Sequence, residues 1–174
     1  MGFDLQPTLT GELVILRPLR REDYAALHAA AGDPLIWQQH PEPTRFLPEA
    51  FRRYFDSGIA SGGAFAVLER ASGKIIGSTR YHDYRPGPPS EIEIGYTFLQ
   101  RAYWGGRYNG EMKRLLVEHA LHSVDRVVFT VGANNLRSRR ALEKIGAKLA
   151  GEIDRPTPDG SPNLLYVLTQ CPEP

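Results

Sequence analysis

Two adjacent glycines, Gly105 and Gly106, stand directly before a run with helical periodicity in the stretch "RAYWGGRYNGEMKR" at 101–114. The first N–H groups of a helix have no partner within the helix, and together they carry about half a positive charge. A glycine has no Cβ, so an anion can approach its backbone closely. The stretch is therefore suited to a phosphate group. A tight turn explains the same two glycines equally well, and no Gly-Lys-Ser/Thr follows them as a P-loop would require.

The composition is that of one ordinary globular domain. The chain has 174 residues and a net charge of +1, from 21 Lys and Arg against 20 Asp and Glu, which disfavours a nucleic-acid partner. The lone cysteine, Cys171, allows no disulfide within the chain and indicates a reducing compartment. There is no secretory leader pattern, and no apolar run approaches the roughly 20 residues of a membrane span. We expect a cytoplasmic protein without a membrane segment.

Hydrophobic periodicity predicts a single domain over residues 1–174, with a core at about 12–170. Strands are expected at 12–19, 63–70, 75–83, 91–99, 126–131, 148–153 and 163–170, and helices at 21–32, 49–59, 108–122 and 134–146. The order predicts one mixed, mostly antiparallel sheet with helices on both faces, an α/β (α+β) fold. Strands 91–99 and 126–131, joined by a helix, should form a right-handed parallel crossover. Gly95 inside strand 91–99 indicates a bulge or the close approach of another group.

Three segments together resemble the GCN5-related N-acetyltransferases (GNAT), and especially the branch that contains the ribosomal-protein N-terminal acetyltransferases. They are "LVILRPLRREDYAALHA", "EIEIGYTFLQRAYWGGRYNGEMKRLL" and "RVVFTVGANNLRSRRALEKIGAKLAGEI", and the resemblance extends over about residues 12–170. It implies a fold in which strands 91–99 and 126–131 splay apart. The pantetheine arm of acetyl-CoA would then lie between these two strands.

The resemblance places the diphosphate loop at 104–109, where the residues depart from the family pattern Q/R-x-x-G-x-G/A. In order, Trp104 stands at the Gln/Arg position, Gly105 and Gly106 at the free positions, Arg107 at the glycine, Tyr108 at the next free position and Asn109 at the small residue. The helix start remains, and Arg107 adds a guanidinium suited to phosphate oxygens. The alternative is that Arg107 points to water and the loop binds CoA less tightly.

Acetyl transfer from a thioester to an amine requires a neutral amine, although a lysine-like amine has a pKa of about 10.4. By the resemblance, a backbone N–H near Phe98 or Leu99 would polarise the thioester carbonyl. Glu93, two residues before Gly95, is our candidate general base acting through a water molecule. The alternative is that Glu93 lies on the exposed side of a half-solvated strand.

Ser138 is the candidate proton donor or sulfur-contacting hydroxyl, and Asn135 lies one helical turn earlier on the same face. Helix capping is the alternative role for both. Tyr166 is a weaker candidate acid and otherwise belongs to the core. The basic residues of this helix either contact the 3′-phosphate of CoA or form a solvated face; they are Arg137, Arg139, Arg140 and Lys144.

The acceptor side is expected among aromatic and histidine side chains. Trp37 and His40 lie in the proline-rich stretch 33–48, and Tyr81 lies in strand 75–83 together with His82. They either line an amine pocket or pack in the core. A protein N-terminus, an aminoglycoside, a polyamine and an amino acid all remain open as acceptors.

We therefore predict an acetyl-CoA-dependent N-acetyltransferase, a monomer or homodimer, with acetyl-CoA as co-substrate and no metal. The histidines show no metal-binding spacing, since no carboxylate pattern accompanies His119 and His122. One alternative is a non-catalytic CoA-binding or sensing module on the same fold. Another is an interaction domain without a cofactor.

Overall fold

The computed structural model describes residues 2–173, and within them it contains one sheet of eight strands in the order β1-β2-β3-β4-β5-β6-β8-β7. The strands are β1 (Leu9–Thr10), β2 (Val14–Pro18), β3 (Ala64–Glu69), β4 (Ile75–Arg85), β5 (Glu91–Leu99), β6 (Arg126–Gly132), β7 (Lys148–Ile153) and β8 (Asn163–Leu168). Neighbours are antiparallel except for β5 and β6. The predicted mixed sheet with one parallel crossover is confirmed. Only β1 was not anticipated, because two residues are too few to show a periodicity.

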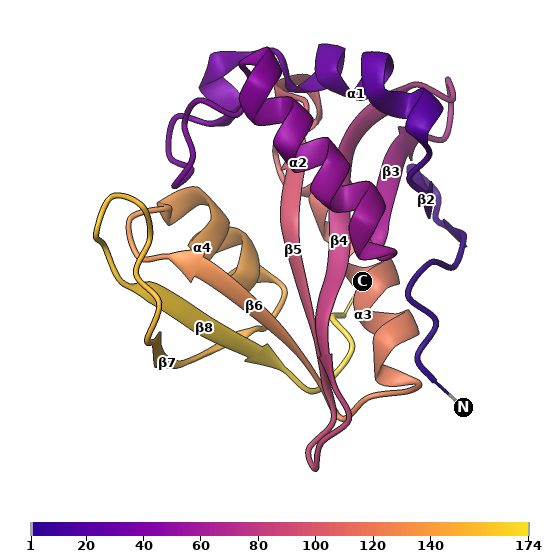
Figure 1. Ribbon diagram of the computed structural model, residues 1–174. Helices are drawn as coiled ribbons and strands as arrows, with labels where there is room; N and C mark the ends of the chain where they lie inside the picture. The colour runs from indigo at the N-terminus through magenta and orange to yellow at the C-terminus, as the bar shows by residue number, and fades with distance from the viewer. Residues whose placement is uncertain (1, 174) are drawn as a thin grey trace.

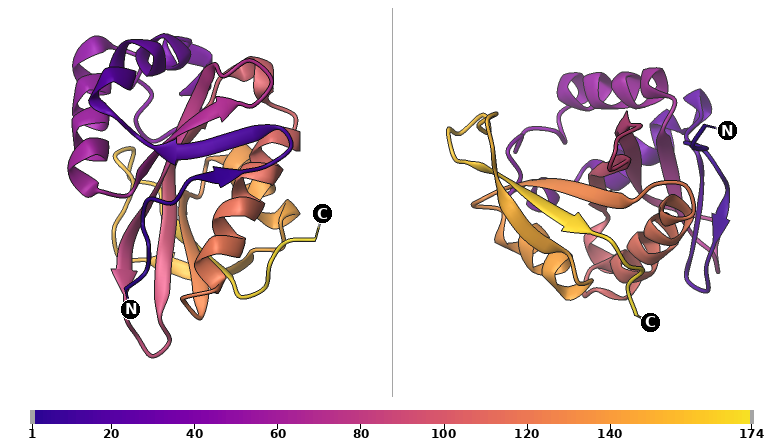
Figure 2. Two further views of the ribbon diagram at one scale, coloured as in Figure 1. Left: turned by 90° about the vertical axis from the view of Figure 1, so that its right-hand side faces the viewer. Right: turned by 90° about the horizontal axis from the view of Figure 1, so that it is seen from below.

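Helices cover both faces of this sheet. They are α1 (Tyr24–Ala31), α2 (Pro48–Ser61), α3 (Arg107–Leu121) and α4 (Leu136–Lys144). Seen from below, α2 lies on one side of the strands and α3 and α4 lie on the other (Figure 2). Each face has its own apolar core: Trp37 and Phe51 belong to the core under α1 and α2, and Met112 and Leu116 to the core under α3.

The second helix shows how local sequence sets its ends. Pro48 is the first helical residue, where its missing N–H costs nothing because that group would be unpaired anyway. Gly62 follows the helix with φ of 66°, a left-handed conformation that favours glycine and stops the helix. As a result α2 extends the expected 49–59 by one residue at its start and two at its end.

The parallel strands β5 and β6 pair only at their beginnings. Their register joins Glu91 to Arg126, Ile92 to Val127 and Glu93 to Val128, and stops there. The Glu91 carboxylate accepts hydrogen bonds from Arg126 at 2.6 Å and from Arg85 at 3.0 Å, so charge reinforces this joined end. From this point the two strands diverge, as Figure 1 shows. The predicted splay is therefore present.

A β-bulge bends β5 at the point where it leaves β6. Gly95 pairs with Arg80 and Phe98 pairs with Ser78, so Tyr96 and Thr97 together oppose the single residue Thr79. Tyr96 has φ of 54°, and its carbonyl accepts a 2.6 Å hydrogen bond from the Tyr54 hydroxyl of α2. An extra residue increases the local bend and twist of a strand. The irregularity expected from Gly95 lies in the next two residues.

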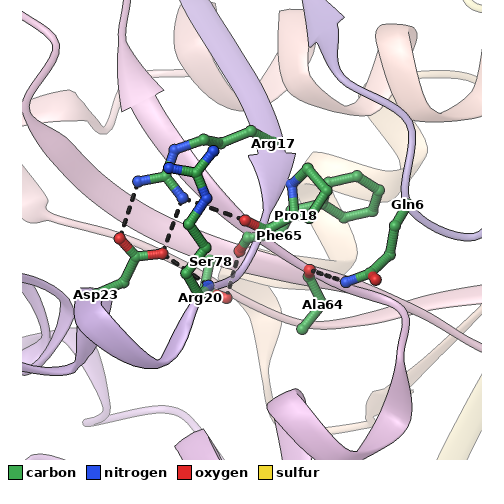
Figure 3. Close-up of polar contacts among 8 residues, drawn as sticks. All are labelled: Gln6, Arg17, Pro18, Arg20, Asp23, Ala64, Phe65 and Ser78. Carbon is green, nitrogen blue, oxygen red and sulfur yellow. Dashed lines mark hydrogen bonds and ion pairs between the residues drawn. The ribbon is translucent and has the colours of Figure 1, made fainter.

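Polar contacts fix the start of the sheet (Figure 3). Arg17 of β2 donates two hydrogen bonds of 2.8 Å to the Asp23 carboxylate ahead of α1. Gln6 reaches the Ala64 carbonyl at 3.1 Å and Ser78 reaches the Phe65 carbonyl at 2.7 Å. These bonds tie the N-terminal segment and α1 to the central strands, on which the site depends.

A single carboxylate attaches α3 to the beginning of β2. Glu111 accepts hydrogen bonds from the backbone N–H groups of Glu12 at 2.8 Å, Leu13 at 2.8 Å and Val14 at 2.9 Å. A Cβ at Gly11 would lie 2.5 Å from this carboxylate, so only glycine leaves room for it. Through these bonds α3, the helix that starts at the two glycines, is anchored to β2, near the edge of the sheet that β1 forms.

We expect Glu111→Ala to lower the free energy of unfolding by about 2 kcal/mol, because backbone donors lose a charged acceptor. Urea denaturation followed by circular dichroism measures this change. The matched control is Glu118→Ala on the same helix, where an exposed 3.5 Å pair with Arg114 should contribute less than about 0.5 kcal/mol. Equal effects of the two substitutions would show that Glu111 does not anchor the helix.

Candidate active site

A cavity of about 290 Å³ lies between the diverging parts of β5 and β6. Its walls are residues 94–99 of β5 and 129–132 of β6, which the ladder leaves unpaired with one another. The start of α3 and one side of α4 close it on one face of the sheet, and residues 36–37 and 40–41 close it on the other. The gap in the sheet is therefore a lined channel that side chains do not fill.

The two glycines of the opening stretch adopt a conformation that other residues rarely take. Gly105 has φ of 115° and Gly106 has φ of 101°, and Gly106 is the N-cap of α3. Both line the cavity, so the positive end of the helix faces it. Lys144 of α4 adds a charge, since its Nζ lies 2.7 Å from where a Gly106 Cβ would be. The glycines form a turn that also suits an anion.

Trp104 has a structural role at the position where the family pattern has Gln or Arg. Its indole Nε1 donates to the Leu99 carbonyl at 2.8 Å, which ties the loop to the end of β5. The Arg137 guanidinium of α4 lies 3.8 Å from the centre of the indole ring and donates to the Ile36 carbonyl at 3.0 Å. The stacked Trp104–Arg137 pair thus joins the glycine turn to α4 and, through Ile36, to the segment on the other face of the sheet.

Most of the residues predicted to bind cofactor lie around the cavity, but two do not. Those that line it are Phe98, Leu99, Trp104, Gly105, Gly106, Asn109, Asn135 and Ser138. Arg107 is exposed as the first residue of α3, and the Tyr108 ring packs edge-on against Tyr103 at 5.0 Å. Successive residues of a helix point in different directions, so only part of the loop can face the channel.

Asn135 caps α4, as one of the two interpretations had it. Its Oδ1 accepts the Ser138 N–H at 3.4 Å, and both residues line the cavity. The cap fixes where α4 begins and so brings Ser138 to the channel wall. Tyr166, the weaker candidate acid, is buried in the core, where its hydroxyl donates to Glu143 at 3.1 Å.

Lys113 is a cavity residue that the sequence did not single out. It is 6% exposed, and its Nζ donates to the Thr97 Oγ1 at 3.1 Å and lies 5.4 Å from the Phe129 ring. Burial lowers the pKa of Lys113 to about 7. The sequence contained a clue to this burial, because Lys113 lies on the same helical stripe as the apolar Leu116 and Val117, which are buried.

Glu93 is buried, not on an exposed strand face, and it lies beside the cavity without lining it. Its Oε2 is 3.8 Å from the Nδ1 of His82, which in turn is 3.0 Å from the Asp83 carboxylate. One ligating atom from each of the three falls within 4.8 Å of the others, a set able to hold a cation. The absence of a metal stays a prediction.

Two of the residues predicted to bind the acceptor, Trp37 and His40, line the cavity. The Trp37 indole donates to the Ala31 carbonyl at 2.9 Å, and the His40 ring packs edge-on against it at 5.4 Å. Burial, with the positive charges of Arg45 and Arg137 nearby, lowers the pKa of His40 to about 3. His40 is therefore neutral at physiological pH.

Tyr81 was a wrong candidate for amine binding. Its side chain is fully buried in the core under α3, and its hydroxyl donates to the Leu116 carbonyl. Alternate residues of a strand face opposite sides of the sheet, and the neighbouring Arg80 reaches Ser57 of α2 instead. The strand mixes polar and aromatic residues along its length, so its sequence did not indicate which alternate residues face α2 and which face α3.

These observations define a class of fold: a mixed sheet with a lined gap between two parallel strands and a glycine turn at a helix start beside that gap, an arrangement suited to an elongated, anionic ligand. The chain belongs to the GNAT acetyltransferase family, whose acetyltransferase (GNAT) domain matches residues 14–148. It is thus an acyltransferase that depends on acetyl-CoA, as its resemblance to the family implied.

Solved structures share the fold. An acetyltransferase (GNAT family) from Bacillus anthracis is 21% identical, with 94% of this chain and 98% of that chain covered and a TM-score of 0.77. A putative acetyltransferase from T. thermophilus is 29% identical, with 93% and 88% covered and a TM-score of 0.75. Mycobacterium smegmatis RimJ, in complex with CoA-disulfide, is 22% identical, with 94% and 87% covered and a TM-score of 0.71.

Bilayer-spanning helices are not found among residues 2–173, where each helix is too short or too polar to cross a membrane.

Replacing Lys113 by Met should change the pH dependence of stability. The folded-state pKa of about 7 lies below the unfolded value of about 10.4, so between these values the unfolded chain binds more protons. The wild-type free energy of unfolding therefore rises with pH through this window, and the lysine is least favourable below pH 7. The free energy of unfolding of Lys113→Met should exceed that of the wild type by more at pH 6 than at pH 9.5, with a difference of at least about 1 kcal/mol.

Urea denaturation at both pH values measures this difference. Lys148→Met provides the control, because Lys148 is exposed and its replacement should have the same effect at both pH values. A Lys113 variant whose advantage does not depend on pH would show that the ammonium is solvated in the folded protein.

Proposed function

We propose that this protein transfers the acetyl group of acetyl-CoA to a primary amine, either a protein N-terminus or an amine on a small molecule. The observation that carries the proposal is the lined channel between β5 and β6, which ends at the glycine turn of α3. An extended arm fits between diverging strands, and a diphosphate fits the amides at a helix start. The neighbouring cavity beside Leu35 and Arg140 has neither feature, because no residue of β5, β6 or α3 lines it.

In this proposal the cofactor contacts follow the channel. The diphosphate lies against Gly105 and Gly106, with the ammonium of Lys144 close by. The pantetheine arm lies along residues 94–99, whose backbone groups on the β6 side have no ladder partner beyond Glu93. The thioester then reaches the bulged part of β5, where a backbone N–H near Phe98 or Leu99 polarises its carbonyl.

The reaction is direct attack of the amine through a tetrahedral intermediate. The acceptor enters from the face that holds Trp37 and His40, and Ser138 lies on the opposite wall as a donor to the leaving sulfur. Glu93 acts from beside the channel, so any base role passes through another group or a water molecule. Oligomeric state, as monomer or homodimer, stays a prediction.

The test measures CoA thiol release from acetyl-CoA in the presence of a panel of amines, together with thermal unfolding in the presence of CoA. We expect amine-dependent release and a stabilisation of about 2.7 kcal/mol at 100 times the Kd of CoA. Stabilisation by CoA without any amine-dependent release would support the alternative, a non-catalytic CoA-binding module. No stabilisation at all would refute CoA binding.

Lys144→Gln should raise the Kd for CoA about threefold to tenfold and reduce its dependence on salt, because a charge near the diphosphate is lost. Isothermal titration with CoA at two salt concentrations measures both effects. Lys148→Gln, four residues further on and exposed, removes the same charge outside the channel and should leave the Kd unchanged. If both variants bind CoA like the wild type, the diphosphate does not lie at the start of α3.

A further inference from the structure

His82 sits where a general base for the acceptor amine would be needed, although nothing in the chemistry above uses it. Its Nδ1 lies 3.0 Å from the Asp83 carboxylate and 3.8 Å from that of Glu93. A carboxylate accepts only, so the neutral ring carries its proton on Nδ1 and leaves the lone pair on Nε2. The side chain is 19% exposed, so a ligand can reach it.

The free nitrogen of this ring faces the channel strand. A Cβ at Gly95 would lie 2.8 Å from Nε2, closer than atoms can pack, so the imidazole occupies the space that glycine leaves. Gly95 itself lines the cavity, at the residue before the bulge. This is the close approach that a glycine inside a strand indicates. Any other residue here would separate His82 from the channel.

Unusual backbone on two strands holds the ring in this place. Asp83 has φ of 52° where the pairing of β4 with β5 is irregular, and Tyr96 has φ of 54° in the bulge. The Tyr96 ring packs edge-on against His82 at 5.1 Å, and the Arg80 guanidinium lies 3.9 Å from the centre of that ring. Conformations of this kind persist where the surrounding structure imposes them, and they gather at functional sites.

We propose that His82 is the general base that deprotonates the acceptor amine, that Asp83 is the positioning residue for its ring, and that Glu93 supports the charged form. This inference deepens the proposed function and rests on it. Neither side chain lines the cavity itself, but Nε2 of His82 lies against Gly95, which does line it. The buried Glu93 carboxylate lies 3.8 Å from the other ring nitrogen, so the ring is the nearer base.

The step balances as follows. The protonated amine gives one proton to Nε2 of His82, and its lone pair then attacks the thioester carbonyl carbon. The carbon–sulfur bond breaks as the amide forms. The Ser138 hydroxyl gives its proton to the leaving sulfur and takes the second proton of the amine nitrogen in return. His82 returns its proton to water. The imidazolium formed in between faces two carboxylates, Asp83 and Glu93, with one cation, Arg80, beyond the Tyr96 ring.

The test compares kcat/KM of the full-length wild type and His82→Gln with a lysine-like amine at pH 7 and pH 9.5. Positioned general bases contribute about 10² to 10⁴-fold, so we expect a loss of at least about 100-fold at pH 7. Near pH 10 such an amine loses its proton to solvent, so the loss should shrink to about tenfold or less. An acceptor whose amine is already neutral at pH 7 should show the same small loss.

Asp83→Asn keeps a residue that tolerates positive φ and removes the carboxylate, so it should cost about tenfold with the same pH signature. The Kd for CoA should be unchanged in both variants, which shows that the channel is intact. His122→Gln at the exposed end of α3 is the matched control and should retain wild-type activity. The same three groups, His82, Asp83 and Glu93, could instead hold a divalent cation. If His82 acts as a base without a metal, activity survives EDTA.

A His82→Gln variant with near wild-type kcat/KM at pH 7 overturns this inference alone, as does a loss that is equal at both pH values. Loss of wild-type activity in EDTA overturns it in favour of a metal site. A wild-type protein that binds CoA yet acetylates no amine overturns the proposed function, and the base with it.

Discussion

The separation of β5 from β6 is the constraint on which the rest of this structure depends. Buried backbone groups need partners, and a sheet normally supplies them along the full length of each strand. Here the ladder ends at Glu93 and Val128, and a bulge turns β5 away. The Glu91–Arg126 ion pair keeps the other end joined. The backbone edges beyond the joined end have no partner in the β5–β6 ladder, and in the proposed function an extended acyl donor binds there in place of a strand.

One helix serves both the fold and the channel. The start of α3 presents its amides to the cavity, its buried side packs in the core, and Lys113 from that side reaches Thr97 on the channel wall. Glu111 on the same helix holds the beginning of β2. Any displacement of α3 would therefore alter the glycine turn, the channel and the edge of the sheet together.

The channel also connects the two faces of the sheet, and this separates the two substrates in the proposed reaction. Residues of α3 and α4 line one end, and Trp37 and His40 line the other. The carboxylates and His82 gather next to the second end, where β4 and β5 are irregular. A donor that enters on one face and an amine that enters on the other meet at the bulge, which is the one part of β5 whose backbone deviates from the sheet.

The sequence by itself determined the elements other than β1, the parallel crossover, the glycine turn at 105–106 and the family. These depend on periodicity, on turn residues and on motifs, which are local along the chain. Only the tertiary structure decided which faces of the elements meet. It placed Tyr81 in the core and its neighbour His82 over Gly95, because the side to which a strand residue points depends on pairing with distant strands. It likewise buried Lys113, since a lysine on a helical stripe is buried or exposed according to what packs against that stripe.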